Sequence, residues 1–504
     1  MALDLLDSGS GDRVDLDEAR VTVVGAGVGG LAAACYLADA GADVRVLEQH
    51  DRPGGHANRM EAEGYTFDTG PSWYLMPDVF ERFFGHFGRS PEEFYELERL
   101  DPHYRVFWKD GDRAEVRADM AHNRALFESY EDGAGGALEA YLEEAEYTYE
   151  VGMDRFVYED RGRFRDFLDL DVLRSAGGLS LLGTMDDHVA GYVEHPKLRQ
   201  LLQYTLVFLG GSPYNTPALY NLMSHVDLNL GVYYPEGGVY SVVEGMVELA
   251  EQLGATVETG RPVRRVERNG AGFRVGTDDG PVAADAVVSN ANPAHVEAEL
   301  LPEGVREHGE GYWDEQTLAP SAYMLYLGVE GDVDPLAHHT LVLPTDWESH
   351  FEAIFEAPAW PTDPAYYVNV PSVTDDTVAP AGGETVVVLV PIAPGLTDDG
   401  AARERFRAQV LDDIAAHTGV DLRGRIAVER EACVSDFSAM YGDPRGSALG
   451  LAHTLRQTGP FRPDHRSDAL EGLYYTGAYT RPGIGVPMCL ISGEHAAEAV
   501  RADH

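Results

Sequence analysis

Residues 20–48 read RVTVVGAGVGGLAAACYLADAGADVRVLE, and this stretch decides the fold. The β-branched run at 21–24 predicts a short buried strand, and the Ala- and Leu-rich run at 31–40 predicts a helix that ends at Gly41. A second strand is predicted at 43–47. Two strands joined by a helix form a βαβ unit, which predicts a parallel sheet.

The three glycines between the first strand and the helix have the spacing of a dinucleotide-binding turn. In this pattern Gly25 makes the tight turn, Gly27 lets the backbone approach a pyrophosphate, and Gly30 allows the helix and strand to pack closely. The N-terminus of the helix then faces the phosphates, where its unpaired N–H groups bind an anion without the help of a lysine.

Glu48 strengthens this interpretation because it ends the second strand, 18 residues after Gly30. A carboxylate at this place accepts hydrogen bonds from ribose hydroxyls and would repel a 2′-phosphate. NADP is therefore disfavoured as the tightly held cofactor. The alternative is that Glu48 is one of the 85 acidic residues of a solvated surface.

The residues that follow favour FAD over NAD. Gln49 comes directly after the carboxylate, a glycine pair lies at Gly54-Gly55, and Gly70-Pro71-Ser72 predicts a rigid turn. A glycine pair at this distance suits a backbone wrapped around a longer, extended dinucleotide, and the turn is a place where the flavin would lie. FAD is therefore the predicted cofactor.

The rest of the chain predicts that the sheet is assembled from separated pieces. A second fragment lies at 232–293, and a third at 473–500 consists of a strand, a Gly/Pro-rich turn and an Ala-rich helix. The elements predicted in the second fragment are a helix at 242–253 and strands at 256–258, 264–266, 273–275 and 286–289.

We predict an α/β protein with a Rossmann-like FAD-binding domain whose parallel sheet is interrupted, an inserted α+β substrate-binding domain and a helical membrane-facing region. The expected order is an FAD-binding part at 20–94, a helical substrate part at 95–230, a second FAD-binding part at 231–310, a second substrate part at 311–430 and a third FAD-binding part at 431–504. The run ETVVVLV at 384–390 belongs to the second substrate part.

A series of motifs extends over nearly the whole chain: VVGAGVGG at 23–30 with Glu48 and Gly54-Gly55, DTGPS at 68–72, FLGGSP at 208–213, YPEGG at 234–238, AHHT at 337–340, FRPDHR at 461–466 and YTGAYTRPGIGVP at 475–487. In this order they resemble the phytoene desaturase family, bacterial and archaeal type, of the flavin-containing amine oxidase-like proteins.

The resemblance implies that Val263 lies beside the adenine, and that Gly477 and the turn Gly485-Val486-Pro487 lie beside the pyrophosphate and flavin. A helix that begins at Pro487 would direct its positive end at the N1/C2=O edge of the flavin, where negative charge develops when the ring accepts a hydride. Two positions depart from the family pattern: His56 stands where an arginine is common, and Met488-Cys489 replaces smaller residues. For His56, a solvated turn and a phosphate contact both stay open.

The resemblance also implies a linear carotenoid substrate that loses two hydrogens from adjacent allylic carbons, with quinone or oxygen as the terminal electron acceptor. The protein would supply a narrow apolar channel that holds the chain against the flavin. No catalytic residue is assigned, because Asp436, Glu236, a histidine or water are all open as the proton acceptor. His225, His338-His339 and His453 are interpreted as structural.

Several activities stay open within this interpretation. They are desaturation of phytoene toward lycopene, 3,4-desaturation of an end-modified lycopene derivative, and carotenoid cis/trans isomerisation on reduced flavin. A flavin-free escort of prenylated proteins is the non-enzymatic alternative. Amine oxidation is a lesser option, because no aromatic cage for an amine is identified.

The composition limits partners and compartment. With 85 Asp and Glu against 38 Lys and Arg, the formal charge is −47, and Lys109 and Lys197 are the two lysines. This predicts a halophilic surface and makes nucleic acid an unlikely partner. Cys35, Cys433 and Cys489 are too far apart to suggest a disulfide framework or a zinc site.

A carotenoid resides in a bilayer, so the protein is expected to be cytoplasmic and peripherally attached to the inner face of the cell membrane. No run of 18 apolar residues and no secretory signal is recognised. The stretches 168–193 and 198–209 are the candidates for an apolar entrance, and ordinary core helices are the alternative.

Overall fold

The computed structural model describes residues 16–17, 19–160, 183–309 and 311–504. Its βαβ unit consists of β1 (Arg20–Val24), α1 (Val28–Asp39) and β2 (Asp43–Leu47). The helix begins three residues earlier than predicted, because Gly29 and Gly30 lie in its first turn after the N-cap residue Gly27. Glycine disfavours helix intrinsically, so close packing rather than propensity places these residues there.

The central sheet has five strands in the order β19-β13-β1-β2-β9, and every neighbouring pair is parallel. Besides β1 and β2 it contains β9 (Thr256–Glu258), β13 (Ala286–Ser289) and β19 (Leu473–Tyr475). These strands come from three separated stretches of the chain, so the sheet is interrupted in sequence as predicted. Their carboxyl ends meet at one edge, which is where ligands bind in open parallel sheets.

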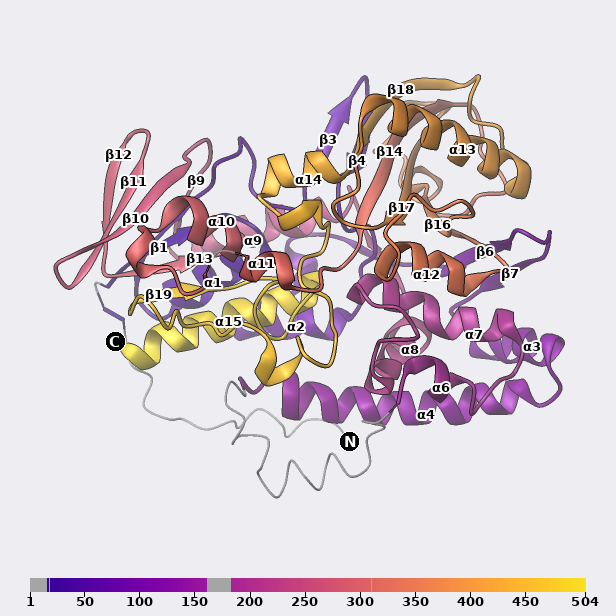
Figure 1. Ribbon diagram of the computed structural model, residues 1–504, viewed down its shortest axis with the longest axis horizontal. Helices are drawn as coiled ribbons and strands as arrows, with labels where there is room; N and C mark the ends of the chain where they lie inside the picture. The colour runs from indigo at the N-terminus through magenta and orange to yellow at the C-terminus, as the bar shows by residue number, and fades with distance from the viewer. Residues whose placement is uncertain (1–15, 18, 161–182, 310) are drawn as a thin grey trace.

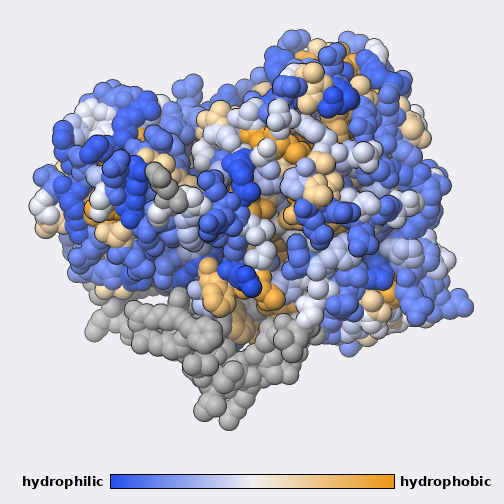
Figure 2. Space-filling view, viewed as in Figure 1, coloured by the Kyte–Doolittle hydropathy of each residue, from blue (hydrophilic) through white to orange (hydrophobic). Residues whose placement is uncertain are grey.

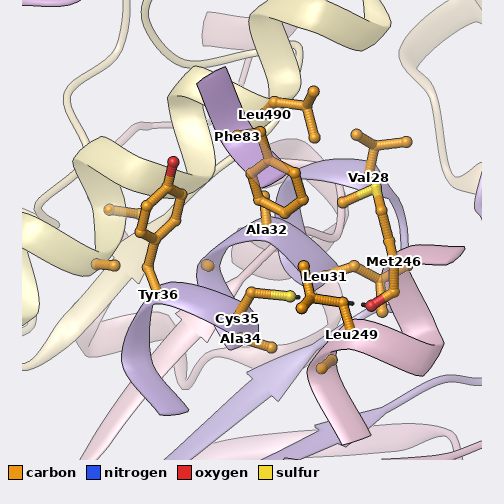
Figure 3. Close-up of a cluster of buried hydrophobic side chains, with 14 of the residues drawn as sticks. Val28, Leu31, Ala32, Ala34, Cys35, Tyr36, Phe83, Met246, Leu249 and Leu490 are labelled. Atoms are coloured by element: carbon orange, nitrogen blue, oxygen red, sulfur yellow. Dashed lines mark hydrogen bonds between the residues drawn. The ribbon is translucent and has the colours of Figure 1, made fainter. Parts of the chain in front are cut away.

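Helix α1 lies between α9 (Tyr240–Gln252) and α15 (Val486–Asp503), and its residues from Val28 to Ala38 are buried. Figure 3 shows Leu31, Met246 and Leu490 from the three helices in one apolar cluster. Contact with α15 is close, because a Cβ on Gly493 would lie 2.5 Å from the Cβ of Ala32. The N-terminus of α1 is therefore held rigidly at the edge of the sheet.

A seven-stranded mixed sheet forms the second large layer, in the order β18-β14-β17-β16-β15-β6-β7. All of its pairs are antiparallel except β6 with β15. Its strands are β6 (Tyr104–Trp108), β7 (Arg113–Val116), β14 (Ser321–Glu330), β15 (His339–Leu343), β16 (Tyr366–Asn369), β17 (Gly383–Ile392) and β18 (Ile426–Ala432). In Figure 1 this sheet lies at the upper right, across the molecule from the parallel sheet.

The other strands form three small antiparallel sheets. In each sheet, the strands are named below in the order in which they pair. They are β10 (Val263–Asn269), β11 (Gly272–Thr277) and β12 (Gly280–Ala284); β3 (Arg59–Ala62) and β4 (Tyr65–Asp68); and β5 (Leu97–Arg99) and β8 (Tyr233–Pro235). Strands β10 and β11 are longer than the sequence predicted, because their antiparallel ladder continues to the pairs Asn269–Gly272 and Val263–Thr277 at its two ends.

The remaining described helices are α2 (Pro77–His86), α3 (Met120–Tyr130), α4 (Ala134–Gly152), α6 (Met185–Val189), α7 (Pro196–Gln203), α8 (Leu222–His225), α10 (Pro293–His295), α11 (Tyr312–Glu315), α12 (Trp347–Phe355), α13 (Gly400–Thr418) and α14 (Val434–Tyr441). Among them, α3, α4, α6, α7 and α8 lie at the lower right of Figure 1, α12 and α13 lie beside the seven-stranded sheet, α10 and α11 lie near the parallel sheet, and α2 packs against α15. The molecule is thus a mixed α/β fold with a parallel sheet.

The two stretches expected to form an apolar entrance have different outcomes. Residues 168–182 lie outside the described part of the chain, and Met185, Val189 and Val193 are core residues. In 198–209 the leucines are buried in the same apolar cluster. The buried leucines of this stretch agree with the alternative, in which it is an ordinary core helix. No helix among the described residues has both the length and the apolar character to cross a membrane.

Candidate functional site

A single continuous cavity of about 1010 Å³ begins at the carboxyl edge of the parallel sheet and continues to the seven-stranded sheet. Val24 and Glu48 line one end, and Leu341, Tyr367 and Leu389 line the other. The first end is polar and rich in glycine backbone, whereas the second is apolar. The cavity therefore joins two chemically different compartments.

Fourteen of the fifteen residues predicted to bind the cofactor line this cavity. They are Gly25, Gly27, Glu48, Gln49, Gly54, Gly55, Gly70, Pro71, Ser72, Val263, Gly477, Gly485, Val486 and Pro487. Gly30 does not line it. A Cβ on Gly30 would lie 2.2 Å from the carbonyl oxygen of Gly25, so this glycine permits the close packing of helix and strand that the sequence pattern predicts.

Glu48 is fixed at the end of β2 by backbone donors. One carboxylate oxygen accepts a hydrogen bond from the N–H of Ala26 and the other from the N–H of His50, both at 2.8 Å. Only 4% of the residue is exposed, and that part faces the cavity. The carboxylate thus joins the glycine turn to the segment after β2, with remaining lone pairs available to ribose hydroxyls.

Asn290, which the sequence analysis missed, organises the glycines from β13. Its side-chain amide lies where a Cβ on Gly27 would stand, at 2.4 Å from the nitrogen. Its oxygen would lie 2.7 Å from a Cβ on Gly29 and 2.8 Å from one on Gly477. The signal for this residue was its position directly after the strand at 286–289, because the carboxyl ends of parallel strands meet at the ligand site.

The N-terminus of α15 lines the same cavity as that of α1. Gly485 is its N-cap, at φ +121°, and a Cβ there would meet nothing closer than 3.8 Å. The preceding turn is held by the Ser492 hydroxyl, which accepts the N–H of Gly477 at 2.9 Å and lies 2.8 Å from the hydroxyl of Thr480. Backbone conformation, rather than lack of space, therefore favours glycine at position 485.

The residues present fit a dinucleotide with a flavin. The first turns of α1 and α15 contain no acidic residue, and neither has a side-chain cap, so their amide groups face the cavity unpaired. Two such helix ends in one cavity suit a pyrophosphate and the electron-rich edge of a flavin. Between them Glu48 suits a ribose, and Val263 supplies an apolar wall for an adenine.

The side chain of His56, which stands where an arginine is common, contacts other residues of the protein. Its Nε2 lies 2.9 Å from the Asp443 carboxylate, and its ring stacks on Tyr441 with centroids 3.9 Å apart. Asp443 is buried and also accepts the side-chain N–H of Asn292 at 2.6 Å. Neither Asp443 nor Asn292 was found from the sequence, although both line the cavity.

The cavity reaches the surface at Leu455 and Phe461. These side chains line the cavity and yet are 67% and 60% exposed. Figure 2 shows apolar side chains in the middle of a face that is otherwise largely hydrophilic. Deeper in the cavity, Tyr204, Val207 and Leu209 form part of the wall, so the stretch 198–209 contributes to the channel from the inside.

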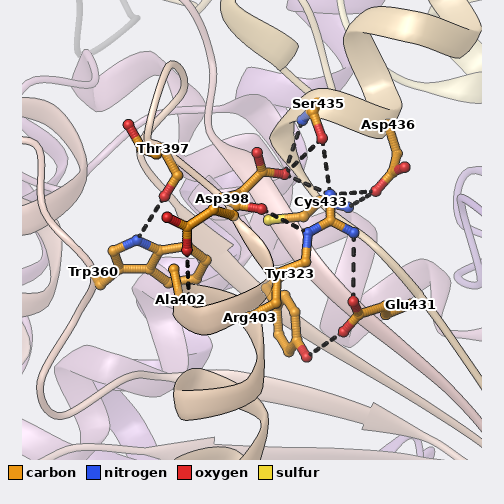
Figure 4. A network of polar contacts seen from close by, with 11 residues as sticks. Tyr323, Trp360, Thr397, Asp398, Ala402, Arg403, Glu431, Cys433, Ser435 and Asp436 are labelled. Atoms are coloured by element: carbon orange, nitrogen blue, oxygen red, sulfur yellow. Dashed lines mark hydrogen bonds and ion pairs between the residues drawn. The ribbon is translucent and has the colours of Figure 1, made fainter.

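The carboxylates named as proton acceptors lie elsewhere. Asp436 takes part in a polar network in which Arg403 binds it at 2.7 Å, as Figure 4 shows. Glu236 lies on the surface, and the charge of Glu96 raises its pKa. Neither residue lines the cavity.

His453 is the one histidine of the four interpreted as structural that lines the cavity. Its Nε2 accepts the N–H of Ile484 at 3.1 Å, and its Nδ1 lies 2.6 Å from the Tyr220 hydroxyl. Burial lowers its pKa well below the usual range. Because both ring nitrogens are engaged and the ring is neutral, His453 positions the turn before α15 and has no free nitrogen for a proton.

The family model for flavin containing amine oxidoreductases matches residues 28–501. The chain belongs to this family. Within the family, a carotenoid 3,4-desaturase of Haloarcula japonica is 60% identical over 491 residues, with 97% of this chain and 99% of that protein covered. A zeta-carotene-forming phytoene desaturase of Myxococcus xanthus is 35% identical, with 95% and 93% covered. This flavoprotein is therefore of the phytoene desaturase type, as its motifs predicted.

Solved structures of this superfamily share the fold of the flavoprotein. A putrescine oxidase bound to putrescine aligns over 96% of this chain and 99% of its own with a TM-score of 0.61 and 15% identity. An oxidoreductase from Methanosarcina mazei covers 95% and 100%, with a TM-score of 0.60 and 16% identity. The cofactor is FAD, as the glycine pair Gly54-Gly55 and the turn Gly70-Pro71-Ser72 predicted. The similarity to Haloarcula agrees with the halophilic composition.

Proposed function

We propose that this protein is an FAD-dependent carotenoid desaturase that introduces a double bond into a linear carotenoid, at the 3,4 position. The supporting observation is the 60% identity, over nearly the full length of both chains, to a carotenoid 3,4-desaturase. The geometry agrees with this function, because one cavity joins a dinucleotide end to an apolar end. Desaturation of phytoene is the second candidate, supported by the 35% identical relative.

When bound, FAD accepts a hydride from an allylic carbon of the substrate. We propose that the fourteen predicted residues of the cavity hold it, with Glu48 at the ribose and the first turns of α1 and α15 at the pyrophosphate and flavin. The chain's own contribution is positional. Tyr204, Val207 and Leu389 keep the polyene in an apolar channel.

We further propose that the proton leaves to water. Within the described residues, the carboxylates that line the cavity are Glu48 and Asp443. Both are held at the dinucleotide end, by Ala26 and His50 and by His56 and Asn292 respectively. His453 has both nitrogens engaged. Loss of a proton from an allylic cation is assisted by conjugation and does not require a strong base.

We propose that the chain divides into an FAD-binding domain, made of residues 20–94, 231–310 and 431–504, and a substrate domain, made of residues 95–230 and 311–430. The five-stranded sheet takes its strands from the first group, and the seven-stranded sheet takes its strands from the second, except that the last two residues of β18 lie beyond the boundary at 430. This arrangement supports an inserted substrate domain.

We propose peripheral attachment to the inner face of the cell membrane, with quinone or oxygen as electron acceptor. Leu455 and Phe461 support this attachment, because they are exposed apolar side chains at the opening of a cavity suited to a membrane-soluble substrate. A surface with a net charge of −47 favours apolar insertion over charge attraction as the means of contact.

The test is a direct conversion assay. Purified FAD-loaded protein is incubated in high KCl with liposomes that contain either phytoene or an end-modified lycopene derivative, together with a quinone. A mass loss of two hydrogens and a red-shifted spectrum with the end-modified substrate alone supports 3,4-desaturation. Conversion of phytoene supports the second candidate, and isomers of unchanged mass indicate an isomerase. A protein that cannot be loaded with FAD would contradict the proposal and revive the prenyl-binding escort.

A further inference from the structure

Three side chains with metal-ligand chemistry converge outside the cavity. Asp160 follows the π-helical turn at Met153–Val157, His465 precedes β19, and His495 lies in α15. One ligand atom of each lies within 4.8 Å of the others. The two imidazole rings meet edge to face, with centroids 5.5 Å apart. Segments far apart in sequence thus bring together two imidazoles and a carboxylate.

Each ring uses one nitrogen to bind a backbone carbonyl. Nδ1 of His465 lies 3.1 Å from the carbonyl oxygen of Tyr475, and Nε2 of His495 lies 3.1 Å from that of Tyr158. Because a carbonyl oxygen only accepts, these two nitrogens carry the protons of neutral rings. The other nitrogens, Nε2 of His465 and Nδ1 of His495, therefore hold lone pairs, and neither has a hydrogen-bond partner among the described residues.

The unpaired nitrogens are withdrawn from solvent, since His465 and His495 are 0% and 3% exposed. A buried polar atom without a partner is costly, and here two acceptors lie beside a third acceptor, the Asp160 carboxylate. A bound cation would satisfy all three groups together.

We propose that Asp160, His465 and His495 form a binding site for a divalent transition metal of the zinc class. Imidazole nitrogen and carboxylate oxygen are zinc ligands. A zinc-bound histidine generally donates its other ring N–H to a carbonyl or carboxylate, as both histidines do here. Three protein ligands leave one tetrahedral position for water.

The charge around the trio restricts the geometry. Arg481 donates its Nε–H to Oδ1 of Asp160 at 2.8 Å, and its Nη2 lies 3.2 Å from Asp464. The metal therefore binds Oδ2 of Asp160, while Asp464 offsets part of the arginine charge. Because Arg481 lines the cavity, the metal would tie the wall of the cavity to α15.

The experiment uses the FAD-loaded protein in high KCl, treated with a chelator and then dialysed against ZnCl₂. We expect one zinc per chain, and a zinc-edge absorption spectrum with nitrogen ligands at about 2.0–2.1 Å. His465→Gln and His495→Gln should each weaken binding by more than about 100-fold, because even indirect changes around a metal cost 10–100-fold. His417→Gln is the matched control, since its ring lies 3.5 Å from Asp413 in a comparable pair.

If the wild type and both histidine variants bind zinc equally well, the zinc binds to the acidic surface and the proposal is overturned. Failure of the wild type to retain stoichiometric zinc would overturn it as well. Folding of the variants is checked by FAD absorbance and far-ultraviolet circular dichroism. If they do not fold, the wild-type spectrum decides, because a ligand shell without imidazole nitrogen excludes this site.

Discussion

The carboxylate of Glu48 accepts the backbone N–H of Ala26 at 2.8 Å, across the turn between β1 and α1. We expect Glu48→Gln to weaken FAD binding by roughly 10–100-fold, because a hydrogen bond to a charged group contributes about 1.5–3 kcal/mol. Titration of the apoprotein with FAD, followed by flavin fluorescence, measures the change. Asp43→Asn, on the exposed start of the same strand, should bind FAD as the wild type does. Equal affinities for both variants would remove Glu48 from the cofactor site.

Gly30 permits the contact between α1 and β1, since a Cβ there would lie 2.2 Å from the carbonyl oxygen of Gly25. Gly30→Ala should destabilise the protein by about 1–3 kcal/mol through overpacking. Gly136→Ala is the opposite case, because Gly136 lies in α4 with open space around its Cα, and helix propensity predicts a gain of up to about 1 kcal/mol. Denaturant unfolding at constant KCl compares the two. If both substitutions change the free energy of unfolding in the same direction, Gly30 does not have this packing role.

Arg462 is buried and donates to backbone carbonyls rather than to a carboxylate, including those of Thr480, Gln457 and Leu451 at 2.9–3.1 Å. Arg462→Lys should cost roughly 2–4 kcal/mol, because an ammonium group cannot reach all of these acceptors from one position. Thermal unfolding and the FAD content of the purified variant measure the loss. An exposed control, Arg430→Lys, should be neutral.

Asp227 is buried, and burial raises the pKa of its carboxyl to about 7, although the Tyr104 hydroxyl donates to it at 2.9 Å. In the unfolded chain the group ionises near pH 3.8. Between these values the folded protein binds more protons, so its stability falls as the pH rises. Asp227→Asn should remove this loss and gain roughly 2–3 kcal/mol relative to the wild type between pH 5 and pH 8.

The measurement for Asp227 is the free energy of unfolding as a function of pH, at constant KCl. Asp132→Asn provides the control, because Asp132 is exposed. Parallel pH profiles for the wild type and Asp227→Asn would show that the buried carboxyl does not titrate in this range.

The exposed apolar pair at the cavity opening predicts how the protein reaches its substrate. Leu455→Glu combined with Phe461→Glu should reduce liposome binding by at least about 100-fold, because each buried apolar side chain contributes about 1.5–3 kcal/mol. FAD content should not change. Val373→Glu, an exposed apolar site away from the cavity, should leave liposome flotation as it is. If the double variant floats with liposomes as the wild type does, Leu455 and Phe461 are not the membrane contact.

Much of the polar end of the site was predictable from local sequence. The strand at 43–47 has the predicted bounds, and Glu48 lies at its end beside the glycine turn. The reason is that hydrophobic periodicity, glycine spacing and the ends of strands can be recognised from neighbouring residues. In a parallel sheet, the carboxyl ends of the strands also lie together at one edge. The C-terminal turn at 485–487 was reached through family resemblance, and it lines the same cavity.

The stretch 198–209 shows where local reasoning ends. A short apolar run has the same sequence pattern whether it faces a core, a channel or a membrane. Only the packing against α4 and the neighbouring strands buries Leu198 and Leu202. The exposed pair Leu455 and Phe461 carries no comparable pattern, because two single apolar residues in a loop are ordinary in sequence.

The sequence by itself thus determined the βαβ unit, the glycine turn with Glu48, the FAD cofactor and the acidic surface. The tertiary structure alone decided that Asn290 fills the space between the glycines and that His56 pairs with Asp443. It also decided that His465 and His495 turn their free nitrogens toward Asp160. These relationships join residues that are distant along the chain, and the distance between two such side chains depends on how helices and sheets pack rather than on any local pattern.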